Sequence, residues 1–295
     1  MKLTVVGHIA IDTIVSDNSQ IISLGGPPSY SGLTARNLGA DVSLLTKYGK
    51  DLPQELLILL KNNNLRISKE ALSKEYPTTR FKIIQTFDKR ELYLEAKCDN
   101  LEKEELFGDA ALVSPIAGEV DLSLLSYIRN RFDTIYLDPQ GFIRKFEPDG
   151  RCLLSNSDVN FLKYVDILKV DYEEAFAITK ARNSLEVFNF LSKIGVKIVI
   201  YSNGAKGVSL MFDNSIYDIP VVMKKEAIDT TGLGDIFAGA FIASYALEDD
   251  PLWSACIGVS ASSLALGKPG LSKIPNLDEV MKLAKETKNK VKRLK

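Results

Sequence analysis

Short runs of apolar, mostly β-branched residues alternate with longer amphipathic stretches along most of the chain, and this alternation limits the fold more than any other feature. Continuously apolar runs of this length are typical of strands buried on both faces. Strands that alternate with helices form βαβ units, so we predict an α/β fold with a mainly parallel sheet and helices on both faces. The expected strands are residues 3–7, 42–46, 111–114, 134–137, 166–170, 197–201 and 208–212. The expected helices are residues 28–38, 53–63, 122–131, 172–179 and 185–194.

Two segments, residues 11–24 and 78–97, break this rhythm. The first has turn-favouring residues at 16–19, and the second alternates apolar and polar residues on both sides of Asp88 and Lys89. We expect a small β-sheet lid, inserted in a single domain that spans residues 1–295. Because so small a sheet needs one face covered, the lid should shield a pocket, pair with a second copy in a homodimer, or both.

Net charge, cysteine spacing and histidine content limit the classes of partner and the kinds of catalysis that this chain could use. A net charge of -1 gives no reason to expect nucleic acid or an anionic membrane as the partner, and no apolar run reaches the roughly 18 residues that a membrane span needs. The three cysteines lack metal-like spacing, which indicates free thiols and a cytoplasmic location. His8 is the only histidine, so we expect acid–base chemistry from carboxylates, lysines or tyrosines.

The most informative run extends from Asp229 to Gly239 and reads DTTGLGDIFAG. Gly232 and Gly234 let backbone N–H groups face one concavity. A helical region is expected directly afterwards, up to residue 267 with a break near 249–251. Backbone donors at the start of a helix form a phosphate site. Asp235 then lies in the first helical turn, where its carboxylate could accept a proton from an attacking hydroxyl. Acidic residues also favour helix starts for electrostatic reasons alone, but the flanking glycines and threonines favour catalysis.

This run resembles the C-terminal signature of the ribokinase-like (PfkB) carbohydrate kinases, which is close to D-T-x-G-A-G-D-x-F-x-G. The resemblance implies a ribokinase-like three-layer sandwich and an enzyme that transfers the γ-phosphate of ATP to a hydroxyl, with Asp235 as the base. The backbone of Gly232, Leu233 and Gly234 would form the anion hole, although Leu233 replaces a small residue. The implied cofactors are ATP and Mg²⁺, with K⁺ as a further candidate because Asp229 matches a segment that often borders a monovalent cation.

Weaker matches extend the resemblance over nearly the whole chain. Asp12 follows the first strand, and Gly25 and Gly26 precede a helix, as do residues that meet the substrate in this family. Glu174 matches a glutamate that helps to hold hydrated magnesium, while Asp171 replaces the asparagine of that motif. Each residue also has an ordinary explanation: a strand-end turn for Asp12, a helix start after the glycines, and a solvated helix position for Glu174.

Another set of matches concerns the nucleotide. Ser202, Gly204 and Gly207 resemble a family turn that touches the nucleotide, although ordinary hairpin chemistry explains the glycines equally well. Thr231, within the signature itself, is expected beside the nucleotide as well. Residues 260–270 correspond to the helix and loop that flank the adenine in these kinases.

The acceptor is less clearly indicated. Tyr30 replaces an asparagine of many sugar-specific members; its ring could stack on a substrate, or it could be a core residue. Asp138 and Arg144 follow a strand, at the sheet edge where α/β folds bind ligands, but an Asp-Pro turn and a solvated arginine would also explain them. Their run resembles inositol-kinase-like and archaeal-type members. The resemblance implies a small polyhydroxylated acceptor: a sugar, a polyol such as myo-inositol, a nucleoside or an open-chain sugar acid.

Two other classes of protein are alternatives to a kinase. A dinucleotide-dependent oxidoreductase would need G-x-G-x-x-G directly after the first strand, where this chain has Gly7-His8-Ile9-Ala10, and a Walker A motif is absent as well. A non-catalytic nucleotide- or polyol-binding protein could share the fold. Such a protein would be expected to lose the base first, whereas Asp235 and both glycines are present.

Overall fold

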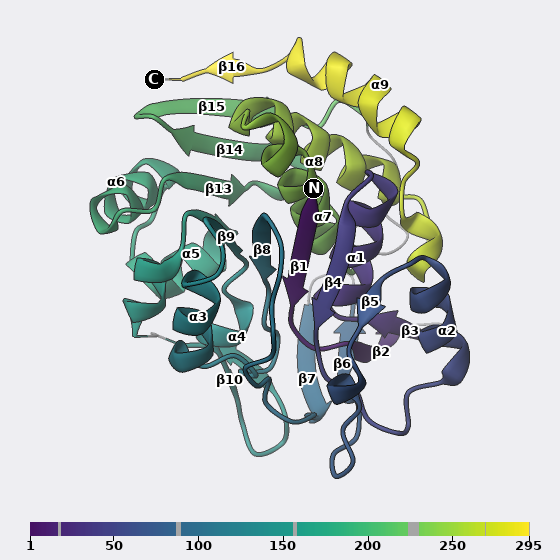
Figure 1. Ribbon diagram of the computed structural model, residues 1–295. Coiled ribbons are helices and arrows are strands. Elements are labelled where there is room, and N and C mark those ends of the chain that lie inside the picture. The colour runs from purple at the N-terminus through teal and green to yellow at the C-terminus, as the bar shows by residue number, and fades with distance from the viewer. Residues whose placement is uncertain (17–18, 87–89, 156–157, 224–229, 269, 295) are drawn as a thin grey trace.

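A ten-stranded sheet forms the centre of the protein (Figure 1). The computed structural model describes residues 1–16, 19–86, 90–155, 158–223, 230–268 and 270–294. Seven neighbouring strands, from β13 to β5, pair in parallel, and β14, β15 and β16 extend the sheet through antiparallel pairs. From edge to edge the order is β16 (Lys292–Arg293), β15 (Ser215–Pro220), β14 (Gly207–Phe212), β13 (Ile198–Ser202), β12 (Ile167–Val170), β9 (Thr134–Leu137), β8 (Ala110–Val113), β1 (Lys2–Val6), β4 (Asp41–Leu45) and β5 (Arg66–Ile67).

Helices cover both faces of this sheet, as predicted (Figure 1). Side chains alternate along the parallel strands, so that on β12 Ile167 joins one core and Leu168 the other. The first core lies under α1 (Pro27–Asn37), α2 (Gln54–Asn62), α7 (Leu233–Glu248), α8 (Pro251–Ala265) and α9 (Leu277–Lys288), and the second under α3 (Leu122–Arg129), α5 (Tyr172–Thr179) and α6 (Ser184–Ile194). Shorter helices are α4 (Gln140–Ile143) and the 3-10 helices η1 (Lys69–Ala71), η2 (Val159–Tyr164), η3 (Gly204–Lys206) and η4 (Gly270–Lys273). Within the described ranges, none of the helices combines the length and apolarity needed to cross a bilayer.

Each strand and helix expected from the sequence overlaps an observed element, and the predicted break between α7 and α8 is confirmed. Asp250 caps α8 by accepting a hydrogen bond from Trp253 N, and Pro251 occupies the first helical position. Strand β15, which returns beside β14 through a tight turn, is not among the strands predicted from the sequence. Asp213 and Asn214 have positive φ values of 46° and 57° in that turn, which is typical of a type I′ hairpin.

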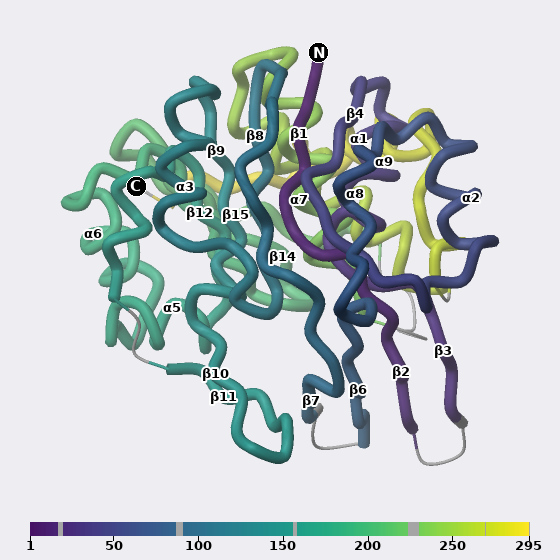
Figure 2. Tube along the Cα trace, turned by 60° about the horizontal axis from the view of Figure 1, so that its bottom comes forward, coloured from purple at the N-terminus to yellow at the C-terminus, as the bar shows by residue number. Residues whose placement is uncertain are grey.

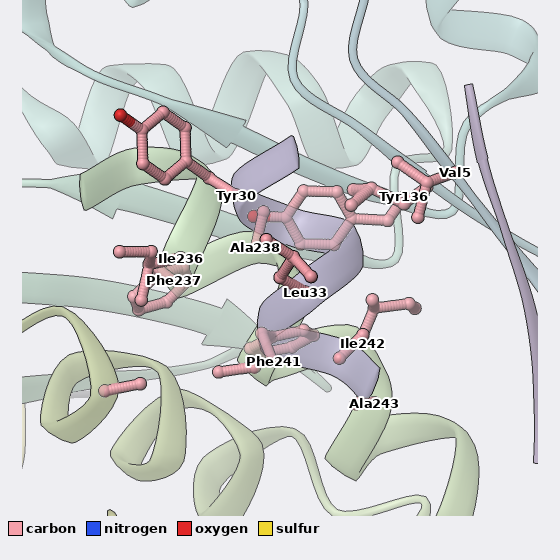
Figure 3. Packing of buried hydrophobic residues seen from close by; sticks show 14 of the residues in the cluster. Val5, Tyr30, Leu33, Tyr136, Ile236, Phe237, Ala238, Phe241, Ile242 and Ala243 are labelled. Carbon is pink, nitrogen blue, oxygen red and sulfur yellow. The ribbon is translucent and has the colours of Figure 1, made fainter. Parts of the chain in front are cut away.

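Helix α7 is buried in the first core from Ile236 to Ser244, a mostly apolar stretch (Figure 3). Phe241 is fully buried on it; its ring lies 5.8 Å from that of Tyr136 on β9 and 6.0 Å from that of Phe237, centroid to centroid. Ile236 and Ile242 of the same helix are buried as well. Packing on every side therefore fixes where the first turn of α7 lies relative to the sheet.

The predicted lid is a four-stranded sheet that projects from one end of the main body (Figure 2). Its order is β3 (Ser19–Gly25), β2 (Ala10–Ser16), β6 (Thr79–Gln85) and β7 (Arg90–Ala96). The two hairpins join through a parallel pairing of β2 with β6. The tips of both hairpins, residues 17–18 and 87–89, lie outside the described residues. A small hairpin of β10 (Arg144–Phe146) and β11 (Cys152–Leu154) lies beside β7, where Leu94 N donates to Gly150 O at 2.8 Å.

The outer strand of the lid, β3, carries exposed apolar side chains. Ile21 and Ile22 are 47% and 68% exposed. Pairing of this edge with a second copy stays a prediction.

Replacing Phe241 with alanine should lower the free energy of unfolding by about 3–5 kcal/mol, because it removes a fully buried ring and leaves a cavity. Urea unfolding followed by circular dichroism measures the change. Phe107→Ala is the matched control: its side chain is 65% exposed, so its loss should cost less than about 0.5 kcal/mol. Equal effects of the two substitutions would contradict the described core.

Candidate active site

Most of the predicted site residues gather at the carboxyl edge of the parallel strands, beneath the lid, where open α/β sheets bind ligands. A cavity of about 250 Å³ lies there. Phe81, Ile83 and Leu92 of the lid form an apolar wall on one side of it. The predicted site residues that line it are Asp12, Gly26, Arg144, Asp171, Glu174, Ser202, Thr231, Gly232, Gly234 and Asp235.

The loop before α7 is a ready anion site. Gly232 is the N-cap residue of this 16-residue helix and has φ +76°, and a side chain there would meet the Tyr30 ring at 2.6 Å. The first N–H groups of a helix have no partner within it. Leu233 N donates to Thr230 O at 3.4 Å, so the N–H groups of Gly234 and Asp235 remain in this turn to face an anion. Tyr30 itself is buried behind this loop and does not line the cavity, which corresponds to the core interpretation of this residue rather than to a substrate contact.

Asp235 lies in the first turn of α7, and its backbone oxygen accepts a hydrogen bond from Ser31 Oγ of α1 at 2.9 Å. Its carboxylate lines the cavity and is partly exposed to it, yet protein surrounds it closely. Desolvation, and then the nearby Asp138 carboxylate, raise the pKa of Asp235 to about 7, while Lys169 opposes this increase. A carboxylate with a pKa near neutrality is well suited to take up a proton.

A buried ion pair lies beneath the site. Asp138 follows β9 and is fully buried, and its Oδ2 accepts from Lys169 Nζ of β12 at 2.8 Å. Asp138 does not line the cavity, so the structure does not bring it into the predicted contact with substrate. Lys169 does line it, and a Cβ atom on Gly234 would lie only 3.2 Å from its Nζ. Lys169 is not among the site residues predicted from the sequence. A lone lysine inside an apolar strand indicates a buried partner for it, because a buried ammonium needs one.

Asp12 reaches the cavity from β2 and is 6% exposed. Gly25 lies against it in β3: a Cβ atom at Gly25 would come within 2.1 Å of Asp12 Oδ2. A glycine at this position therefore lets the carboxylate lie flat against the backbone. His8, by contrast, is buried away from the site, where its Nδ1 and Nε2 lie 2.8 Å from Thr79 Oγ1 and 2.7 Å from Asp99 O.

Asp171 and Glu174 form a capping box at the start of α5. Asp171 Oδ1 accepts from Glu174 N at 2.9 Å, and Glu174 Oε2 accepts from Asp171 N at 3.0 Å. Aspartate and asparagine cap helices about equally well, so the departure from the family motif at Asp171 preserves this geometry. Both residues also line the cavity, so a structural role and a ligand role can coexist.

The same two carboxylates fit a hydrated magnesium ion. Burial, followed by the carboxylates of Asp138 and Asp171, raises the pKa of Glu174, and a divalent cation would relieve this crowding of negative charge. Within the described ranges, no three acidic, histidine or cysteine side chains come close enough to hold a metal by themselves. Magnesium readily keeps several waters, so water and donor phosphates would complete its ligands.

A second cavity, of about 620 Å³, adjoins the first. Lys169, Ser202, Thr230 and Gly234 line both cavities, so the two compartments meet at these residues. The predicted nucleotide residues Gly204 and Gly207 line the larger one. Its apolar lining consists of Ala205, Val208, Val221, Leu233, Phe237, Val259 and Leu266.

The remaining prediction concerns the monovalent cation. Asp229 lies outside the described residues. In the described part of its segment, the Thr231 carbonyl oxygen accepts a hydrogen bond from Lys273 Nζ at 2.7 Å. The sequence analysis did not single out Lys273, because nothing in its local pattern relates it to a loop some forty residues earlier in the chain.

Comparison with known proteins agrees with this geometry. The family model of the pfkB family carbohydrate kinases matches residues 3–278. A cytidine kinase of Thermococcus kodakarensis is 30% identical over 258 residues, which cover 83% of this chain and 88% of that protein.

Solved structures show the same fold. A pyrophosphate-dependent kinase of the ribokinase family superposes with a TM-score of 0.83 at 23% identity, covering 95% of this chain and 99% of that one. The nucleoside kinase of Methanocaldococcus jannaschii gives 0.79 at 19% identity, covering 97% and 98%. The fold predicted from the signature before α7 is thus confirmed. Because the family model matches residues 3–278 and the cytidine kinase is 30% identical over most of both chains, this chain belongs to the pfkB family of carbohydrate kinases.

Proposed function

We propose that this protein is an ATP-dependent kinase that transfers the γ-phosphate to a hydroxyl of a small polyhydroxylated acceptor, with Asp235 as the general base. The observation that carries the proposal is the place of Asp235 beside the anion loop, where the two cavities meet. A donor in one compartment and an acceptor in the other would bring the reacting groups together there.

Residues of this chain can perform each step of the phosphoryl transfer. Asp12 of β2 and Asp235 of α7 both line the acceptor cavity, so an acceptor hydroxyl held there would lie within reach of the base. Asp235 takes the proton as the hydroxyl oxygen attacks the γ-phosphorus, and the bond from this phosphorus to the bridging oxygen breaks to release ADP. The backbone N–H groups before and within the first turn of α7 stabilise the transferring phosphoryl group. The Lys169 ammonium adds positive charge beside Gly234. Magnesium, when bound with the donor, supplies further positive charge to the phosphates.

The larger cavity favours ATP over pyrophosphate as the donor. Its apolar lining can bury the face of an adenine ring, whereas pyrophosphate has no apolar part that would use it. The volume of about 620 Å³ falls in the usual range for such ligand sites. The hydroxyls of Ser262 and Ser263 in this lining donate to backbone oxygens of α8, so each could only accept a hydrogen bond from a base edge.

The acceptor cavity favours a nucleoside among the predicted acceptors. A polyol presents hydroxyls in all directions, but Phe81, Ile83 and Leu92 of the lid offer an apolar wall that a flat base would cover. A further cavity of about 270 Å³ shares Leu92 and Arg144 with the first and provides room beside it. The similarity to a cytidine kinase supports the same choice.

Asp235→Asn should lower turnover by about 10²–10⁴-fold, because asparagine cannot accept the proton. In the wild type, kcat/KM should rise about tenfold per pH unit up to about pH 7 and then level off, because only the ionised carboxylate is a base. Release of ADP, followed across this pH range, measures both effects. A variant with near-normal turnover would exclude Asp235 as the base.

The fold control for this variant is its melting temperature. The folded-state pKa of Asp235 lies above that of an unfolded aspartate, so its ionised form opposes folding once the pH exceeds about 4. Asp235→Asn should therefore melt a few degrees above the wild type at pH 8 and together with it near pH 4.

A wild type that binds ATP but phosphorylates no acceptor would support the non-catalytic alternative.

Ser262→Trp should raise the KM for ATP by about tenfold or more, because a half-buried side chain that lines the larger cavity would then occupy the space of the base. Ser262→Ala, which keeps that space open, should leave the KM near the wild-type value. Steady-state kinetics with ATP and with pyrophosphate as donors provide the test. Efficient use of pyrophosphate, with no effect of the tryptophan, would contradict the nucleotide donor.

Among cytidine, other nucleosides, ribose, fructose, myo-inositol and ketodeoxygluconate, a nucleoside should give the highest kcat/KM. Phe81→Ala should reduce kcat/KM for the nucleoside by about tenfold and that for ribose much less, because only the nucleoside has a base to cover the ring. Ribose thus serves as the internal control. Higher turnover with myo-inositol, or equal losses for ribose and nucleoside, would assign a different acceptor.

A further inference from the structure

Lys273 is a fully buried lysine beneath the anion loop. It ends the 3-10 helix η4, and its Nζ donates to the Thr231 carbonyl oxygen at 2.7 Å. The same ammonium lies 5.6 Å from the centroid of the Tyr30 ring. Taking an ammonium out of water costs several kcal/mol unless strong acceptors compensate it, and the Thr231 carbonyl oxygen is one such acceptor.

The carbonyl that Lys273 binds belongs to the peptide that carries the Gly232 N–H. The described part of the chain contains only trans peptides, in which the C=O and N–H bonds point in opposite directions. An ammonium that holds the Thr231 oxygen on one side therefore turns the Gly232 N–H to the other side of the loop. The hydrogen bond also polarises the peptide and makes that N–H a stronger donor.

Tyr30 completes the arrangement. Its ring lies against Gly232, where a Cβ atom would approach within 2.6 Å, and the Lys273 ammonium lies near the same ring. The electron-rich face of a tyrosine ring attracts a cation. Residues from α1, η4 and the loop before α7 thus hold a single peptide group in one orientation.

This geometry disagrees with the monovalent cation implied for the Asp229 segment. The Thr231 carbonyl oxygen already binds an ammonium, and a second positive charge at the same oxygen would be repelled. We propose that Lys273 is the built-in cation of the anion loop: a positioning residue that orients the Gly232 N–H and makes the enzyme independent of K⁺. This inference rests on the proposed phosphoryl transfer at the same loop.

The test measures how cations affect anion binding and turnover. Calorimetry gives the Kd of ATP and of pyrophosphate with Mg²⁺, in K⁺ and in tetramethylammonium at equal ionic strength. In the wild type, both affinities and the turnover should change by less than about twofold between the salts. Lys273→Ala in tetramethylammonium should bind both anions about tenfold more weakly and turn over about 10²-fold more slowly. Ammonium or K⁺ should restore much of this loss by entering the space left by the side chain.

The matched control is Lys47→Ala, which removes a similar contact of a buried lysine that lines neither cavity. Lys47 is 8% exposed, and its Nζ donates to Glu70 O at 2.8 Å. This variant should melt at a lower temperature but keep its anion affinity, with no response to cations. Should Lys273→Ala fail to fold, Lys273→Met, which keeps the length and loses the charge, and the cation response of the wild type decide the question.

A wild type that loses more than about tenfold in turnover without K⁺ would overturn the proposal, as would a Lys273→Ala variant that matches the wild type in tetramethylammonium. Pyrophosphate separates this question from the donor question. A wild type that binds pyrophosphate but not ATP would contradict the ATP donor, while the pyrophosphate affinities of the variants still test Lys273. A wild type that binds neither anion would overturn Lys273 as the organiser of an anion site.

Discussion

Burial of α7 from Ile236 to Ser244 is the constraint on which the rest of the structure depends. A helix that packs through Phe237 and Phe241 has no freedom to move along its axis, so its first turn occupies a fixed place at the carboxyl edge of the sheet. The contact from Ser31 Oγ to the Asp235 backbone oxygen ties this turn to α1 as well. The positions of the proposed anion loop, of the proposed base and of the boundary between the two cavities all follow from that placement.

Negative charge is concentrated around the first turn of α7. Asp12, Asp138, Glu174 and Asp235 converge on a region that must also accept an anionic donor. Lys169 offsets part of this charge through its bond to Asp138, yet the remaining repulsion keeps the pKa of Asp235 high. The electrostatics that make ionisation of the base costly thus also give it a useful affinity for a proton.

The fold and much of the site could be predicted because they depend on local patterns. Alternating apolar runs specify the parallel sheet, and the sequence around Gly232 specifies a loop that precedes a helix. Lys169 and Lys273 escaped prediction for the opposite reason: their meaning depends on Asp138 and Thr231, which lie 31 and 42 positions away in sequence. Asp138 and Tyr30 occupy plausible positions along the chain, but only the packing determines that they lie beneath the cavity rather than in it.

Two carboxylates that line the smaller cavity, Asp12 and Asp235, belong to parts of the protein that unfold with different cooperativity. Asp235 is carried by α7, whose opening would disrupt the main core, so its exposure requires nearly global unfolding. Asp12 is carried by β2, in a small sheet that projects from the body and has few buried contacts of its own. Such a sheet can open at a fraction of the global free energy. The proposed acceptor site would therefore be complete only in the fraction of molecules in which the lid is folded against the body, and its apparent affinity would be reduced by that fraction.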